Sequence, residues 1–329
     1  MHTFKNFEEV LYTVNENTFD DIALRLFRYQ AVNNPVYSDY LKYLGINSTS
    51  VSSLAQIPFL PISFFKSHTV TTGIWPEEAV FSSSGTTGSL TSRHLVQSLA
   101  FYQSHSEGIF EQFFGPLYDF HILALLPSYL EREGSSLIYM VDHFIKRSKS
   151  PHSGFYLNDL DALLKKIGII KGSGRKVLLL GVSFALLDLA EKHEVDLSHC
   201  IVMETGGMKG RRKELVREEL HGILSQRLNV PVIHSEYGMT ELLSQGYSFG
   251  NGIFQLPEYM KIMLRDVNDP FTWAKTGKTG MINVIDLANF HSCAFIETQD
   301  LGRTREDGNF EILGRADNSD ARGCNLLVG

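Results

Sequence analysis

Cysteine is scarce in this chain, and long apolar runs are missing. The 329 residues contain three cysteines, Cys200, Cys293 and Cys324, whose spacing matches neither a zinc site nor a disulfide framework. No stretch reaches the roughly 18 apolar residues of a membrane span, and the acidic N-terminus is unlike a signal peptide. We therefore expect a cytoplasmic protein with no membrane span, in which Cys200 and Cys293 are core residues because they lie in or beside apolar runs.

An excess of positive charge is also missing. The chain carries 30 Lys and Arg against 37 Asp and Glu, which gives a net charge of −7. Affinity for nucleic acid rests largely on Lys and Arg that neutralise phosphates, so we expect no nucleic-acid partner and a local site for any anionic ligand. Hydrophobic residues make up 43% of the chain, which is enough for a large buried core.

Apolar runs that alternate with helical periodicity predict a layered α/β fold with a largely parallel sheet. The runs that suit buried strands are His121–Leu126, Lys176–Leu180, Cys200–Met203 and Val230–His234. The clearest helix is expected over Arg211–Leu228. An earlier helical segment over Phe19–Tyr43 is expected to break at Asn34–Pro35. The prolines of Ile57–Ile62 predict an extended connector that stays out of the sheet interior.

The sequence pattern changes after about Tyr259. Shorter strand-like pieces, such as Met281–Ile285 and Phe310–Leu313, are separated there by glycine-bearing turns. We expect three parts. An α/β layered core with a helical N-terminal segment covers 1–258, and a small β-rich subdomain covers 259–314. A hinge remnant and C-terminal tail cover 315–329.

Hydroxyl side chains and glycines crowd into one segment directly after an apolar stretch. The segment, called the phosphate loop below, comprises Ser83, Ser84, Gly85, Thr86, Thr87 and Gly88. Glycines let backbone N–H groups point inward and hydroxyls donate further hydrogen bonds, so the composition suits phosphate binding. It lacks the Gly-Lys-Ser/Thr ending of a Walker loop. Taken alone, such a cluster is more often a flexible surface loop.

Three polar segments follow downstream. They are Tyr237–Glu241, Glu297–Arg303 and Gly314–Asp317. The first comes after the expected strand Val230–His234, and open parallel sheets bind ligands at that end of a strand. Tyr237 offers an aromatic face to a purine and Glu241 a carboxylate for Mg²⁺. Asp300 could accept hydrogen bonds from ribose hydroxyls. Each segment alone is more often an ordinary turn.

The order of these four segments resembles that of the adenylate-forming superfamily, which includes acyl-CoA ligases, peptide-synthetase adenylation domains and firefly luciferase. The resemblance implies an ATP site in which the phosphate loop cradles the phosphates. Tyr237 would stack on adenine and Glu241 would support Mg²⁺. Asp300 and Arg315 would address the ribose. The other site positions implied are the catalytic Thr86 and, around the nucleotide, Gly206, Gly207, Gly238 and Thr240.

Further segments narrow the resemblance to one branch. They are Ile57–Pro61, Phe64–Lys66, Leu126–Leu130, Thr205–Lys209 and Arg322–Cys324. Together they look like the acyl-protein synthetase of bacterial fatty acid reductase systems, in which an acyl-adenylate forms and the acyl group moves to a cysteine near the C-terminus. Cys324 matches that position, and a thiolate is suited to attack an acyl-adenylate. The resemblance implies ATP and Mg²⁺, a carboxylic (fatty) acid substrate, and an acyl-reductase or acyl-carrier protein as partner.

Two departures from the superfamily leave alternatives open. Its Pro-Lys-Gly continuation of the loop is missing, so Arg93 is only a candidate for the phosphate-facing cation. We expect the superfamily's large C-terminal domain, which carries the catalytic lysine, to be missing or vestigial, and Lys209 is a candidate to replace that lysine. His121 is a weaker candidate to flank the acyl pocket. The alternative functions are an acyl-CoA ligase and a catalytically silent nucleotide-binding subunit of a reductase complex.

Overall fold

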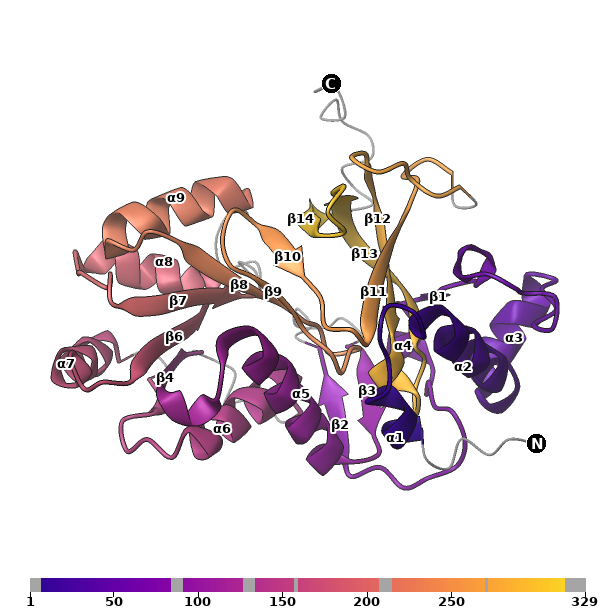
Figure 1. Ribbon diagram of the computed structural model, residues 1–329, viewed down its shortest axis with the longest axis horizontal. Coiled ribbons are helices and arrows are strands. Elements are labelled where there is room, and N and C mark those ends of the chain that lie inside the picture. The colour runs from indigo at the N-terminus through magenta and orange to yellow at the C-terminus, as the bar shows by residue number, and fades with distance from the viewer. Residues whose placement is uncertain are drawn as a thin grey trace.

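One 12-stranded mixed sheet runs through the chain in the computed structural model, which describes residues 7–83, 91–126, 134–156, 159–206, 215–269 and 272–316 (Figure 1). The main strands are β4 Phe120–Leu125, β5 Gly154–Phe155, β6 Lys176–Val182, β7 Cys200–Thr205, β8 Ile233–Tyr237, β9 Gly246–Ser248, β10 Ile253–Gln255, β11 Met260–Arg265, β12 Thr279–Asp286, β13 Phe295–Thr304 and β14 Phe310–Arg315. Their order in the sheet is β11-β12-β13-β14-β10-β9-β8-β7-β6-β4-β5.

The strands β5, β4, β6, β7 and β8 run parallel, as the apolar runs predict. Helices cover both faces of this half, because each crossover between parallel strands must return over the sheet (Figure 1). The helices α5 Leu99–Phe114 and α6 Ser136–Ser148 lie on one face, and α8 Ser183–Lys192 and α9 Arg217–Leu228 lie on the other. The layered α/β fold is confirmed.

The helical opening divides as expected at Asn34. It forms α2 Phe19–Asn33 and α3 Pro35–Tyr43, with α1 Phe7–Leu11 before them. The Asn34 side chain accepts a hydrogen bond from the Tyr37 backbone N–H at 3.0 Å and so caps α3. Phe27 and Tyr37 pack on the Phe295 ring of β13, with centroids 5.9 and 6.3 Å apart, which fixes the helices against the C-terminal strands. The remaining helical pieces are α4 Phe64–Ser67, α7 Leu160–Ile170, η1 Leu54–Gln56, η2 Leu117–Asp119 and η3 Leu287–Asn289.

The strands β11 to β14 are joined in antiparallel pairs, and they continue the same sheet because β14 pairs with β10. The division at 258/259 stays a prediction. The proline segment does more than connect: β1 Leu60–Pro61 pairs in parallel with β13, and Leu60 is fully buried. Proline is tolerated there because Ile62, not Pro61, donates to Glu297 O at 2.9 Å.

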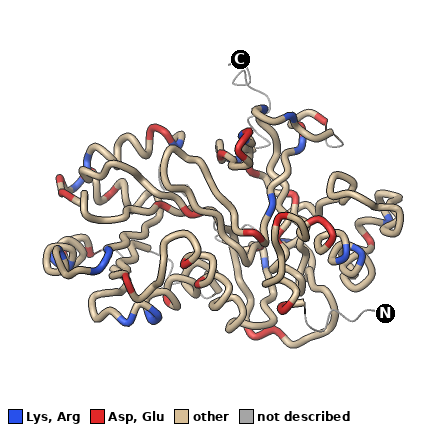
Figure 2. The backbone as a smooth tube through the Cα atoms, in the orientation of Figure 1, with Lys and Arg blue, Asp and Glu red and all other residues tan. Residues whose placement is uncertain are grey.

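Figure 2 shows acidic and basic residues mixed along both halves of the molecule. Within the described ranges, none of the helices has the length and apolar character needed to cross a lipid bilayer.

Candidate functional site

The phosphate loop connects two antiparallel strands, β2 Ala79–Ser82 and β3 Arg93–Val96. Ser83 and Ser92 close its base: Ser83 N–H donates to Ser92 O at 3.1 Å, and Ser92 N–H donates to Ser83 Oγ at 2.9 Å. These bonds fix where the loop leaves and rejoins the strands. Arg93 starts β3 with an exposed side chain. The remaining loop positions lie outside the described residues; they are Ser84, Gly85, Thr86, Thr87 and Gly88.

The parallel strands β7 and β8 end side by side, with Thr205 opposite Glu236. Gly206 follows β7 with φ of +68°, a conformation that favours glycine. Gly238 follows Tyr237 in a place where a Cβ atom would lie 2.4 Å from Glu236 Oε1. A side chain at this position would therefore have to displace the buried Glu236 carboxylate. Gly207 and Lys209 lie outside the part of the chain that the structure describes.

Tyr237, Asp300 and Arg315 meet at this edge of the sheet. The Tyr237 hydroxyl donates to Asp300 Oδ2 at 2.9 Å, and Arg315 Nε lies 3.6 Å from Asp300 Oδ1. Asp300 and Arg315 are directly opposite each other on β13 and β14. Tyr237 is 8% exposed, and its ring packs against Phe254 and Phe310. Three segments that are far apart in sequence are thus in one place.

Glu241 joins the phosphate loop to this group. Its side chain is 5% exposed, and burial raises the pKa of its carboxyl group. The nearby Ser92 hydroxyl and the positive charges of Arg315 and Lys66 lower that pKa, against the burial effect. Through Ser92 at the base of the loop, the fold brings all four sequence segments together.

Opposing effects also act on the pKa of Asp300. Burial raises the pKa of Asp300, while the Tyr237 hydrogen bond and the charges of Arg315 and Arg217 lower it. Arg217 was missed from the sequence. It begins α9, donates to Glu204 Oε1 at 2.8 Å and lies over the Phe254 ring at 4.9 Å. No local signal could have found it, because its partners come from β7 and β10.

A second buried carboxyl group lies directly under the site. Burial, and then the nearby charge of Glu204, raise the pKa of Glu236 to about 7, while a hydrogen bond from the Thr205 hydroxyl to Glu236 Oε2 acts the other way. Glu204 lies on the opposite face of the sheet, because its neighbour Thr205 pairs with Glu236 and successive side chains alternate. Glu236 is therefore a titratable group close to Tyr237.

A bound Mg²⁺ would have to use few protein ligands. Within the described ranges, no three His, Cys, Asp or Glu side chains cluster closely enough to hold a metal ion. Mg²⁺ in phosphate-transfer sites keeps several waters and takes one or two carboxylates together with substrate phosphates. Glu241 supplies one buried carboxylate, and none of the ion pairs among the described residues involves it, so it fits that arrangement.

Cys200, Cys293 and His121 lie away from the group formed by Tyr237, Asp300 and Arg315. Cys200 and Cys293 are buried, as expected, and burial raises the pKa of each thiol to about 12, which makes them poor nucleophiles. Cys324 lies outside the described residues. His121 is near the N-terminal end of β4, hydrogen-bonded to Ser150 and Ser173 at 2.6 and 2.9 Å. These contacts match a hydrogen-bonded structural residue, and a place for His121 beside the acyl pocket stays a prediction.

No protein-family model matches the chain, and no curated protein matches it either. Several solved structures do match the chain. 2-Hydroxyisobutyryl-CoA ligase in its postadenylation state aligns with a TM-score of 0.66 at 11% identity, covering 92% of this chain and 69% of that one. This chain has the adenylate-forming fold. The same ligase with 2-HIB-AMP and CoA gives a TM-score of 0.64 at 14% identity, with the same coverage.

ATP-bound MatB from Rhodopseudomonas palustris aligns with a TM-score of 0.53 at 17% identity over 73% of this chain. The alignment covers 48% of MatB, so the chain spans about half of that protein's length. At these identities the likeness concerns the fold, which corresponds to the N-terminal domain of adenylate-forming enzymes.

Proposed function

We propose that this chain activates a carboxylic acid with ATP, giving an acyl-adenylate and pyrophosphate. One observation carries the proposal: Tyr237, Asp300, Arg315 and Glu241 converge at the carboxyl edge of β8, beside the base of the phosphate loop. Structures of the same fold were solved with ATP and with an acyl-AMP ligand, which supports a nucleotide as the ligand here.

The proposed nucleotide contacts use groups that are already oriented. Asp300 is held by the Tyr237 hydroxyl on one oxygen and by Arg315 near the other, so its remaining acceptor positions are available to ribose hydroxyls. Tyr237 supplies the aromatic surface for adenine, with Gly206, Gly207 and Gly238 allowing close backbone approach. Arg315 has a side chain that is 68% exposed, and its guanidinium group is proposed to turn toward the ribose or the phosphates when the nucleotide binds.

In the reaction, a carboxylate oxygen of the acid attacks the α-phosphorus of ATP, and the bond from that phosphorus to the bridging oxygen breaks. Pyrophosphate leaves with the electron pair. Donors from the phosphate loop, including Thr86, and the hydroxyl of Thr240 stabilise the charge that develops on the phosphate oxygens. Glu241 would hold Mg²⁺, which supplies positive charge to the phosphates. Lys209 is proposed to supply a cation to the phosphate or carboxylate charge.

The second step we propose is transfer to Cys324: its thiolate attacks the acyl carbonyl carbon, the bond from that carbon to the AMP oxygen breaks, and a thioester forms. β14 ends at Arg315, and Ala316 N–H donates to Gln299 O at 2.8 Å, so the chain is fixed beside Asp300 up to that point. Cys324 follows Ala316 by eight residues. Eight residues span at most about 29 Å, a length that permits the sulfur to reach the site.

We further propose that the acid is a fatty acid and that the thioester passes to an acyl-reductase or an acyl-carrier protein. An acyl-CoA ligase is the second candidate, because structures of this fold carry CoA beside an acyl-AMP. Coenzyme A in place of the protein thiol distinguishes the two: acyl-CoA would accumulate in a ligase, whereas the leading proposal gives acylated protein without CoA.

The deciding experiment is ATP–pyrophosphate exchange with the purified chain and a panel of acids, namely acetate, octanoate, hexadecanoate and 2-hydroxyisobutyrate. Acid-dependent return of radioactive pyrophosphate into ATP is expected with at least one of them. A silent subunit would show none. Formation of ADP in place of AMP would rule out adenylation.

A matched pair of variants locates that activity. Glu241→Ala should reduce the exchange, whereas Glu107→Ala should retain it. Glu107 is also largely buried, at 15% exposure, but it pairs with His143 and Arg147 on the α5–α6 face of the molecule.

A further inference from the structure

Ser92 and the first residues of β3 run alongside the segment that carries Glu241. The Ser92 side chain lies close enough to the Glu241 carboxyl group to lower its pKa, and His94 Nδ1 lies 2.8 Å from Thr240 O. A carbonyl oxygen only accepts hydrogen bonds, so Nδ1 carries the proton and donates. Ser92 and His94 are 2% and 1% exposed, so both contacts are made without competition from water.

The other side of the same segment is anchored at the end of β12. Asn289 Nδ2 donates to Glu241 O at 2.8 Å. Asp286 accepts from the backbone N–H groups of Leu243 and Ser244 at 2.9 and 3.0 Å, and from Ser244 Oγ at 2.6 Å. The backbone that leads into and out of Glu241 is therefore held between β3 and the β12–η3 junction.

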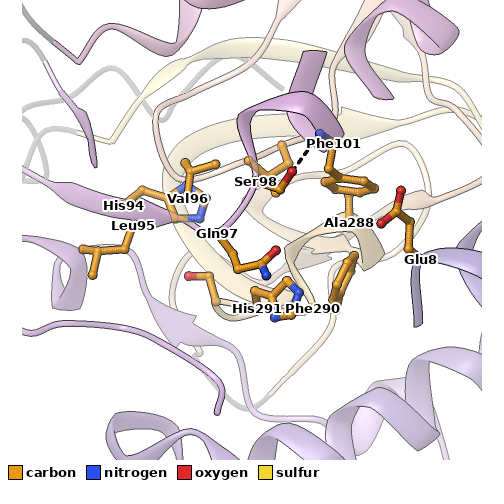
Figure 3. Close-up of a pocket in the computed structure, with 12 residues that line it drawn as sticks. Glu8, His94, Leu95, Val96, Gln97, Ser98, Phe101, Ala288, Phe290 and His291 are labelled. Atoms are coloured by element: carbon orange, nitrogen blue, oxygen red, sulfur yellow. Dashed lines mark hydrogen bonds between the residues drawn. The ribbon is translucent and has the colours of Figure 1, made fainter. Parts of the chain in front are cut away.

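The surroundings of His94 leave no room for a substrate. Its ring lies edge-on to Phe65 and Phe81, at centroid distances of 5.7 and 6.4 Å. A cavity that it lines has a volume of about 20 Å³, and Leu243 and Phe290 also line this cavity (Figure 3). A cavity of that size holds about one water molecule. Burial lowers the pKa of His94 to about 4, so the ring stays neutral and keeps one N–H donor.

We propose that His94 is a positioning residue of this site, which sets the direction of the Glu241 carboxylate through the carbonyl group of Thr240. The inference rests on the proposed function. It also gives β3 a role in joining the two halves of the ATP site. Ser92, the residue before β3, donates its N–H to Ser83 Oγ at the base of the phosphate loop, and its side chain lies close enough to Glu241 to lower the pKa of that carboxyl group. Ser92 and β3 thus connect the carboxylate for Mg²⁺ to the base of the loop for the phosphates.

Two substitutions separate the donor role of His94 from its role in packing. Asn carries Nδ2 at the same distance along the side chain as His Nδ1, so His94→Asn keeps the donor but leaves a larger cavity. Leu fills more of the space but cannot donate, so His94→Leu leaves the Thr240 carbonyl group without this partner. His94→Gln is the substitute for Leu if that variant does not fold, because it carries the amide one bond too far.

The first measurement is the Mg²⁺ concentration that gives half-maximal pyrophosphate exchange. His94→Leu should raise it about tenfold, the effect of losing one buried hydrogen bond, and His94→Asn should stay within about twofold of wild type. The control is His121→Leu, which removes a histidine that is equally well buried, at 4% exposure, but at the opposite edge of the sheet. It should lower thermal stability and leave the Mg²⁺ requirement unchanged.

The second measurement does not need activity. Hydrogen exchange at the Leu243 and Ser244 amides should quicken in His94→Leu and not in His94→Asn or His121→Leu. If the wild-type protein were inactive in pyrophosphate exchange but the variants showed this pattern of amide hydrogen exchange, the proposed function would be refuted and the positioning role of His94 would remain. Equal impairment of the Asn and Leu variants would mean that the ring only fills space. Unchanged amide hydrogen exchange in His94→Leu would also overturn the proposed positioning role.

Discussion

The bond between Tyr237 and Asp300 joins two segments of the proposed site, and Tyr237→Phe removes it without removing the ring. The hydroxyl donates to a largely buried carboxylate at 2.9 Å. Hydrogen bonds to charged groups contribute about 1.5–3 kcal/mol. The other partner, Arg315, is 3.6 Å away with a side chain that is 68% exposed, so it compensates little. We therefore expect a loss of about 2 kcal/mol in the free energy of unfolding.

Thermal unfolding measures this loss. An unfolding entropy of about 2.1 cal/mol/K per residue, over 329 residues, corresponds to about 0.7 kcal/mol per degree, so Tm should fall by about 3 °C. The same variant should bind ATP more weakly, because the pKa of Asp300 rises further once the Tyr237 hydroxyl is gone. The ring remains between Phe254 and Phe310, so the fold should persist.

Tyr247→Phe is the matched control. Tyr247 is 1% exposed, and within the described residues its hydroxyl has no hydrogen-bond partner, so its removal should leave Tm unchanged or slightly raised. It lies on the neighbouring strand, opposite Glu236. If the two variants had equal Tm values and equal ATP affinities, the reasoning about Asp300 would be refuted.

Three further predictions concern chemistry and pH. Glu241→Ala and Thr86→Ala should each lower pyrophosphate exchange by about 10²-fold, and wild-type rates in both would remove them from the site. Cys324→Ser should keep the exchange but lose hydroxylamine-sensitive labelling by a radioactive acid; labelling that persists would exclude an acyl-cysteine there. Burial raises the pKa of Glu236 from 4.5 to about 7, so ionisation penalises the folded state. That penalty is absent below pH 4.5 and grows to about 3 kcal/mol as the pH rises through 7. The free energy of unfolding, measured with urea, should therefore fall less between about pH 5 and pH 8 in Glu236→Gln than in the wild type. An equal fall in both proteins would contradict this.

The strands could be predicted because their signal is local. The apolar runs became β4, β6, β7 and β8, although β8 starts at Ile233. The proline pattern of Ile57–Ile62 indicated an extended backbone. It could not indicate the pairing with β13, because that partner is distant in sequence and depends on how the sheet closes.

The residues of the candidate site likewise fall into those that the sequence predicts and those that only the fold reveals. Tyr237, Asp300 and Arg315 were identified from ordered motifs, but their contacts follow from β8, β13 and β14 lying at one edge. His94 and Arg217 carried no motif signal. Both act through backbone or side-chain partners on other elements. Residues that position a site are harder to predict than residues that contact a ligand, because only the fold reveals what they hold.

Transfer of oxygen-18 from the acid to AMP would show directly that this chain forms an acyl-adenylate. The purified chain is incubated with ATP, Mg²⁺ and the acid that supports pyrophosphate exchange, labelled with oxygen-18 in its carboxylate. Attack of that carboxylate on the α-phosphorus leaves one labelled oxygen on the phosphate when the acyl group departs. We expect AMP that carries a single oxygen-18. AMP without label, or label in inorganic phosphate, would exclude attack of the carboxylate on the α-phosphorus.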